Sequence, residues 1–313
     1  MDKKEARILY LGTPEISANV LESLLENGYN IIGVVAQEDK ETDRKGRLLE
    51  VPTKNIAKKY DIPVYQFHKI KEHFDDIEKL SPDIILTMAY GQIISENILK
   101  IPSIGSYNLH GSLLPKYRGA APIQYSLLNG DNKTGVTLME MVKEMDAGKM
   151  FYKDEFEIEE EDNYSSLQKK ISVSAFNAFD NGIQDIMDGK NLGLEQNALE
   201  VTFTSKITAD LEKINFNNEA NHIKNIVRAL SDTPGTYFVY KNDKYKVFKV
   251  KDSKDNKPHQ PGRIQKYDKN GFEIETSDGY ISILSIQKPG KKMMNFRDFY
   301  NGNQNLFVIG DII

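Results

Sequence analysis

The sequence predicts an α/β protein in which a Rossmann-like, mostly parallel sheet is followed by a small OB-like β-barrel domain. Up to residue 189, short apolar runs alternate with amphipathic helical patterns, which is typical of a parallel sheet covered by helices. Beyond residue 230, short strands follow one another closely, as they do in small antiparallel barrels. The length of 313 residues also exceeds what one hydrophobic core usually holds.

The expected first domain runs from residue 1 to residue 189. The first helix is expected to follow Thr13, a suitable capping residue, and Pro14 suits its first position. Further helices are expected at 52–61 and, closing the domain, at 163–189. The first strand-to-helix turn, LGTPE, is not G-x-G-x-x-G, and the chain has no P-loop motif, so neither nucleotide-binding signature is present. The expected strands are the apolar runs at 7–12, 31–36, 62–67, 81–88, 103–110 and 135–141.

A linker is expected at 190–206, followed by the OB-like domain at 207–313 with one helix at 217–230. Basic residues outnumber acidic ones from Lys206 onward, whereas the preceding part is acidic and the whole chain has a net charge of -5. OB-like folds often bind nucleic acid, and a basic domain favours a polyanionic partner. Chance surface charge is the alternative explanation. The expected strands of this domain are 236–242, 244–250, 262–268, 271–279 and 280–286.

The composition excludes several kinds of site. There is no cysteine, so disulfides, thiolate catalysis and cysteine-based zinc sites are ruled out. Every apolar run is shorter than the roughly 20 residues of a membrane span. The charged N-terminal segment MDKKEARILYLG lacks the apolar region of a signal peptide. We therefore expect a cytoplasmic protein without a membrane partner.

Three polar residues near two expected strand ends suit acyl transfer. Asn108 and His110 share one face of their strand, and Asp146 follows the next strand in a loop that ends at Gly148. In sheets of this kind, ligands bind beyond the carboxyl ends of the strands. There the imidazole would accept the proton of an attacking amine, the amide would stabilise an oxyanion, and the carboxylate would orient the imidazole. The sequence contains no G-x-S-x-G elbow, so no covalent nucleophile stands out.

The segments NLHGSLLPKYRGAAPIQ and NGDNKTGVTLMEMVKEMDAGKM resemble the 10-formyltetrahydrofolate-dependent formyltransferases. Asn-x-His, S-L-L-P, T-G-V-T and D-x-G occur in this order. The chain is similar over nearly its whole length to the branch of that family that formylates methionyl-tRNA, notably through AQEDKETDRKGRLLEVPTK and IQKPGKKMMNFRDFYNG. It departs from the usual pattern at Gly111, at Asp232 and Thr233, and through a more acidic loop around Glu38 and Glu41.

The resemblance implies formyl transfer from 10-formyltetrahydrofolate, a co-substrate, to the α-amine of initiator methionyl-tRNA. We expect no metal, no DNA partner and a monomeric chain. The implied catalytic residues are Asn108, His110 and Asp146. The implied folate contacts are Ser112, Leu113, Leu114, Pro115, Met88, Tyr90 and Gly91, and the implied tRNA contacts are Arg44, Lys45, Arg47 and Lys206.

Three alternatives stay open at this point. A histidine at a strand end is often structural, and Asp146 would also suit a turn or a cap. In the second alternative, the chain is a formyltransferase whose substrate is a nucleotide-linked aminosugar. Formylation of such a sugar would reveal this activity. A non-catalytic protein that only binds folate or tRNA is the third possibility, and any turnover would exclude it.

The polar segment 37–51 generates a first prediction, because it is too long for an ordinary strand-to-helix loop and has little to bury. Its cations Arg44, Lys45 and Arg47 would order against an acceptor stem, offsetting the ordering entropy with phosphate contacts. We expect Arg44→Ala to impair the use of charged tRNA while folate affinity is little altered, and tRNA to protect the loop from trypsin. Equal cleavage with and without saturating tRNA, together with normal efficiency of the variant, would contradict this role.

Overall fold

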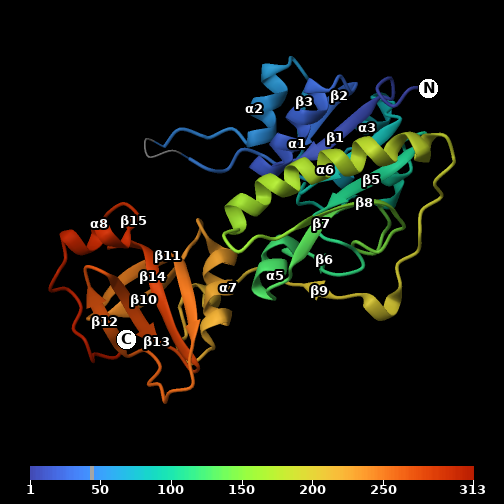
Figure 1. Ribbon diagram of the computed structural model, residues 1–313. Helices are drawn as coiled ribbons and strands as arrows, with labels where there is room; N and C mark the ends of the chain where they lie inside the picture. The colour runs from blue at the N-terminus through green and yellow to red at the C-terminus, as the bar shows by residue number, and fades with distance from the viewer. Residues whose placement is uncertain (43–45) are drawn as a thin grey trace. The chain divides into compact units, whose positions relative to one another are not determined.

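The computed structural model describes residues 1–42 and 46–313, and two compact units can be distinguished in it (Figure 1). The first unit comprises residues 1–122, 133–157 and 168–204. The second unit comprises residues 123–132, 158–167 and 205–313. The division into domains at 189 and 206 stays a prediction. Among the described residues, no helix combines the length and apolarity needed to cross a membrane.

The first unit is built on a seven-stranded sheet with the order β3-β2-β1-β4-β5-β7-β8. The first five strands in this order are parallel, whereas β7 and β8 are antiparallel to their neighbours, so the predicted mostly parallel α/β fold is confirmed. The order changes direction between β1 and β4, and in open α/β sheets ligands bind beyond the carboxyl ends of the strands at such a point. The strands are β1 (Ile8–Gly12), β2 (Ile31–Ala36), β3 (Val64–Gln66), β4 (Ile84–Met88), β5 (Gly105–His110), β7 (Lys133–Glu140) and β8 (Met150–Glu157).

Successive side chains of β1 point to opposite faces of this sheet and are buried on both. Tyr10 is buried on the face covered by α1, where its hydroxyl donates to the carbonyl of Ser17 (2.8 Å). Leu9 and Leu11 are buried on the other face with residues of α3 and α4. Both faces are therefore apolar, as a parallel sheet requires. The helices are α1 (Glu15–Glu26), α2 (Pro52–Lys59), α3 (Phe74–Lys79), α4 (Glu96–Leu99), α5 (Pro122–Leu128) and α6 (Tyr164–Met187), with the 3₁₀ turn η1 at Ile70–Glu72.

Two local expectations were wrong. Thr13 does not cap α1, because the N-cap is Pro14 and the Thr13 hydroxyl instead donates to the carbonyl of Tyr90 (3.2 Å) and accepts from the amide of Gln37 (3.1 Å). The strand after α5 does not run parallel to β5. It is antiparallel, with His110 opposite Thr137, and it is followed by β8, which the sequence patterns did not predict.

The second unit holds an antiparallel sheet with the order β10-β11-β14-β13-β12, and β15 pairs with β14. These five strands were all predicted. Their core is rich in aromatic rings, among which Phe272 and Phe307 stack with ring centroids 4.6 Å apart. The elements are α7 (Ala220–Leu230), β10 (Thr236–Tyr240), β11 (Asp243–Lys254), β12 (Ile264–Asp268), β13 (Gly271–Glu275), β14 (Gly279–Gln287), β15 (Met294–Asn295), α8 (Phe296–Asn301) and η3 (Ala209–Glu212).

Between the last long helix and the second unit, the chain passes back along the first unit. After the 3₁₀ turn η2 (Ala198–Glu200) it forms β9 (Phe203–Thr204), which pairs in parallel with β6 (Arg118–Gly119). This two-stranded ribbon was not predicted. It lies within the first unit and contacts the site described next.

Candidate active site

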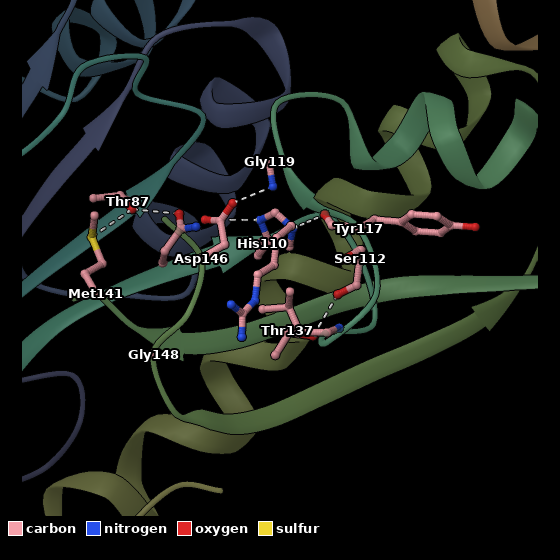
Figure 2. Close-up of polar contacts among 12 residues, drawn as sticks. Thr87, His110, Ser112, Tyr117, Gly119, Thr137, Met141, Asp146 and Gly148 are labelled. Atoms are coloured by element: carbon pink, nitrogen blue, oxygen red, sulfur yellow. Dashed lines mark hydrogen bonds and ion pairs between the residues drawn. The ribbon is translucent and has the colours of Figure 1, made fainter. Parts of the chain in front are cut away.

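The site is organised around β5, whose polar end lies between β4 and β7. Thr87 of β4 is the register partner of Asn108, and Thr137 of β7 is the register partner of His110. The period of two puts Asn108 and His110 on the same face, the one on which the Ser106 hydroxyl donates to a carbonyl of α4. Figure 2 shows the side chains from these three strands converging with Asp146.

His110 is buried, with 5% of its side chain exposed, and both ring nitrogens face acceptors. Nε2 lies 2.8 Å from the carbonyl oxygen of Tyr117, which accepts but cannot donate, so Nε2 carries hydrogen. Nδ1 lies 3.6 Å from Oδ1 of Asp146, beyond ordinary hydrogen-bond distance. In the neutral ring Nδ1 is therefore the free base. Nδ1 and the Asp146 carboxylate therefore face one another.

Asp146 reaches His110 by a route that differs from the expected one. Because β7 is antiparallel, its last residues lie opposite the middle of β5, and the following loop turns back along the sheet towards His110. Asp146 adopts a left-handed backbone conformation (φ 52°) in this loop. Its Oδ2 accepts a hydrogen bond from the amide of Gly119 (2.8 Å), and its carbonyl accepts from the side chain of Gln196 (2.8 Å). The expected trio is brought together, although the strand direction was wrong.

The side chain of Asn108 is oriented by Thr87. The Thr87 hydroxyl donates to Oδ1 of Asn108 (2.7 Å), which leaves the amide Nδ2 as a donor. Thr87 Oγ1 also lies 3.4 Å from Sδ of Met141, at the start of the Asp146 loop (Figure 2). The site therefore contains a hydrogen-bond donor and a base on one strand, which is what attack of an amine on a carbonyl carbon requires.

The segment from Ser112 to Pro115 is held by β7 and β8. Thr137 both donates to the Ser112 carbonyl (2.7 Å) and accepts from the Leu114 amide (3.0 Å). Lys153 of β8 donates to the Leu114 carbonyl, and burial lowers the pKa of its ammonium group. Ser112, Leu114 and Pro115 are buried and Leu113 is half-buried, so mainly Leu113 and the backbone present surface to a ligand.

The expected folate residues Met88, Tyr90 and Gly91 lie at the carboxyl end of β4. Met88 and Tyr90 are buried, whereas Gly91 is exposed in a left-handed conformation (φ 91°). The Tyr90 carbonyl accepts hydrogen bonds from the Thr13 hydroxyl and from the side-chain Nε2 of Gln37, both at 3.2 Å. Burial raises the pKa of the Tyr90 hydroxyl to about 12, and among the described residues this hydroxyl has no hydrogen-bond partner.

The predicted tRNA-binding cations lie outside the segments that hold the predicted catalytic and folate-binding residues. Arg44 and Lys45 lie outside the described residues. Arg47 is exposed beside the isolated bridge between Thr42 and Leu48, and Lys206 is exposed two residues after β9. Within the described ranges, no group of three or more metal-ligating side chains is arranged to hold a metal ion.

Sequence reasoning missed Thr87, Gly119 and Gln196. Thr87 carried a signal, because it is a polar residue inside the apolar strand IILTM. Gly119 and Gln196 carried none, since they reach Asp146 from 27 and 50 residues away.

Comparison with known proteins shows the family of the chain. Residues 6–181 match the family model described as formyl transferase, and residues 206–304 match the model of its C-terminal domain. The chain belongs to the formyl transferase family. Methionyl-tRNA formyltransferase of Lactobacillus acidophilus is 39% identical over 309 residues, covering 98% of each chain. The enzyme of that name from Mycoplasma mycoides subsp. mycoides SC is 41% identical over 313 residues, covering 99% of each chain.

Two solved structures with lower sequence identity share the fold. An N-formyltransferase of Helicobacter canadensis, in complex with folinic acid and dTDP-3-aminofucose, has a TM-score of 0.66 at 22% identity and covers 92% of this chain and 100% of its own. HypX of Aquifex aeolicus in complex with tetrahydrofolic acid has a TM-score of 0.65 at 16% identity, and covers 98% of this chain and 49% of its own. At these identities the likeness concerns the fold.

The contact between Thr87 and Asn108 generates a second prediction. Thr87→Val removes the hydroxyl that fixes the Asn108 amide while keeping a β-branched side chain of similar size. We expect single-turnover formyl transfer to slow by about 10- to 100-fold, since a misdirected donor stabilises the oxyanion poorly. Thr87→Ser keeps the hydroxyl and should remain near the wild-type rate. Equal rates for Thr87→Val and the wild type would show that Asn108 needs no such orientation.

Proposed function

We propose that this formyltransferase moves the formyl group of 10-formyltetrahydrofolate to the α-amine of initiator methionyl-tRNA, giving N-formylmethionyl-tRNA for translation initiation. The observation that carries the proposal is the 39–41% identity to methionyl-tRNA formyltransferases over nearly the entire chain, including the second unit. The reaction belongs to the cytoplasm, where initiation takes place. One chain supplies the whole trio, which supports action as a monomer.

In the proposed reaction, the free amine attacks the formyl carbon and a new C–N bond forms. Nδ2 of Asn108 donates to the oxygen that becomes negatively charged. Nδ1 of His110 accepts the proton released by the amine, and the Asp146 carboxylate stabilises the resulting imidazolium. When the tetrahedral intermediate collapses, the bond from the formyl carbon to N10 breaks and N10 takes up a proton, leaving tetrahydrofolate.

We propose that the folate lies against the carboxyl end of β4 and the backbone of Ser112–Pro115. The amides and carbonyls there are fixed by Thr137, Lys153 and Thr13, so a planar ring would meet a rigid edge. The Tyr90 hydroxyl, which has no hydrogen-bond partner among residues 1–42 and 46–313, and the exposed Gly91 lie in the same segment. All seven predicted folate residues belong to the first unit.

The second unit, with Lys206 and residues 207–313, is proposed to bind the tRNA. Several of its cations are already paired with acids, as Lys224 is with Asp252 (2.8 Å). Lys291 and Lys292 differ, because they are exposed and the described part of the chain gives them no acidic partner. Such cations suit phosphate contacts, which release counterions and make affinity depend on salt.

An aminosugar substrate is not favoured. The sugar formyltransferase of Helicobacter canadensis is 22% identical to this chain, well below the identity to the tRNA enzymes.

The test of the proposed function is formyl transfer from 10-formyltetrahydrofolate to charged initiator tRNA, charged elongator tRNA and a nucleotide-linked aminosugar. We expect turnover with initiator methionyl-tRNA and a loss of about 10²-fold or more in His110→Ala, the usual scale for losing a positioned acid–base group. His222→Ala, which changes an exposed histidine of α7, is the matched control and should be unaffected. Turnover of the aminosugar alone, or of neither substrate, would contradict the proposal.

A further inference from the structure

The ribbon formed by β6 and β9 exposes an aromatic ring beside the site. Phe203 of β9 is 67% exposed, although the next residue, Thr204, is buried. This alternation is what a strand with one inward face produces. Single exposed apolar side chains are common on protein surfaces, so the exposure of Phe203 gains meaning only from its place beside the site.

The ribbon is rigid where Phe203 is attached to it. The Thr204 hydroxyl donates to the Arg118 carbonyl (3.2 Å) and accepts from the Ala121 amide (3.1 Å). The Tyr117 amide donates to the Thr202 hydroxyl (2.8 Å). Gly119 (φ 112°) allows the close approach, since a Cβ there would lie 2.4 Å from the Thr204 carbonyl oxygen. A ring on such a platform would lose little entropy when it binds a flat partner.

The same ribbon is bonded directly to the catalytic side chains. The residues before and after Arg118 in the sequence make these bonds. The Tyr117 carbonyl accepts from Nε2 of His110, and the Gly119 amide donates to Oδ2 of Asp146. Arg118 and Phe203 are register partners, so their side chains share one face of the ribbon. Phe203 thus lies on the strand paired with the segment that contacts the base, about 5 Å from that segment at ordinary strand spacing.

The chemistry of the two side chains fits the end of a nucleic acid. An exposed aromatic ring stacks on any base, and a neighbouring guanidinium suits a phosphate. The Nε of Arg118 donates to Gln196 (2.9 Å), which orients its charged end. In an aminoacyl-tRNA, an ester and one ribose separate the reacting amine from the terminal base. In this chain, one hydrogen-bonded segment, Tyr117–Gly119, separates His110 from Phe203.

We infer that Phe203 stacks on the terminal adenine of the aminoacyl-tRNA, with Arg118 beside the adjoining phosphate. The inference rests on the proposed function and adds a contact that positions the acceptor end at the trio. Phe203 is a positioning residue, because it touches the substrate away from the reacting atoms.

The test combines a change in the protein with a change in the RNA, measured as kcat/KM for formyl transfer. The enzymes are the wild type and Phe203→Ala. The substrates are methionyl-tRNA and the same tRNA with an abasic ribose at its 3′ terminal position. We expect each single change to lower kcat/KM by roughly 5- to 100-fold. The double change should lower it little further, because both remove the same contact.

Four further measurements make the result decisive. Phe203→Tyr should retain efficiency with intact tRNA, whereas Phe203→Leu should resemble Phe203→Ala, since stacking needs a ring. Folate affinity should be unchanged in all variants, which also reports that they are folded. Val173→Ala, at an exposed apolar position of α6, is the control and should have no effect.

Three results would each overturn the inference. They are a normal kcat/KM for Phe203→Ala, a double change whose loss in kcat/KM is the product of the two single losses, and a wild-type kcat/KM for Phe203→Leu. If the wild type fails to formylate intact methionyl-tRNA, the proposed function fails instead.

Discussion

The hydrogen bond from the Gly119 amide to the Asp146 carboxylate is the contact on which the site depends. It joins the loop after β7 to the ribbon after β5, two segments that are not paired by a strand ladder in the described part of the chain. One oxygen of the carboxylate is held there, so the other faces Nδ1 of His110 at 3.6 Å. In the proposed reaction, this gap leaves Nδ1 available as the base, and the nearby charge is the group assigned to stabilise the protonated ring. Fixing one oxygen therefore controls the chemistry of the other.

The parallel sheet supplies the remaining precision. Thr87 and Asn108 are register partners on adjacent strands, so the donor that orients the amide is placed by the backbone ladder itself. The antiparallel strand β7 contributes Thr137, whose single hydroxyl fixes two backbone groups of the Ser112–Pro115 segment. Each group that would touch a substrate is thus held by a partner on a rigid element, as preorganised catalysis requires.

Local patterns were sufficient to predict much of this arrangement. Period-two spacing placed Asn108 and His110 on one face, and the alternation of strands and helices predicted the sheet. The direction of β7 was not predictable, because an apolar strand reads the same in either direction. Nor were the partners of Asp146, since Gly119 and Gln196 approach it through loops whose path depends on tertiary packing. Thr13 shows the same limit, because a hydroxyl suited to capping is used to join two strand ends.

The central claim is that the Asp146 charge stabilises the proton taken up by His110, and Asp146→Asn tests it most directly. An asparagine keeps an oxygen to accept from Gly119, so the loop should stay in place while the charge is lost. The measurement is the single-turnover rate of formyl transfer with both substrates saturating, with Asp76→Asn, at an exposed position of α3, as the control. A fall of about 10²-fold or more in Asp146→Asn, with folate affinity unchanged, is the predicted result. A rate near that of the wild type would contradict the assigned role of Asp146.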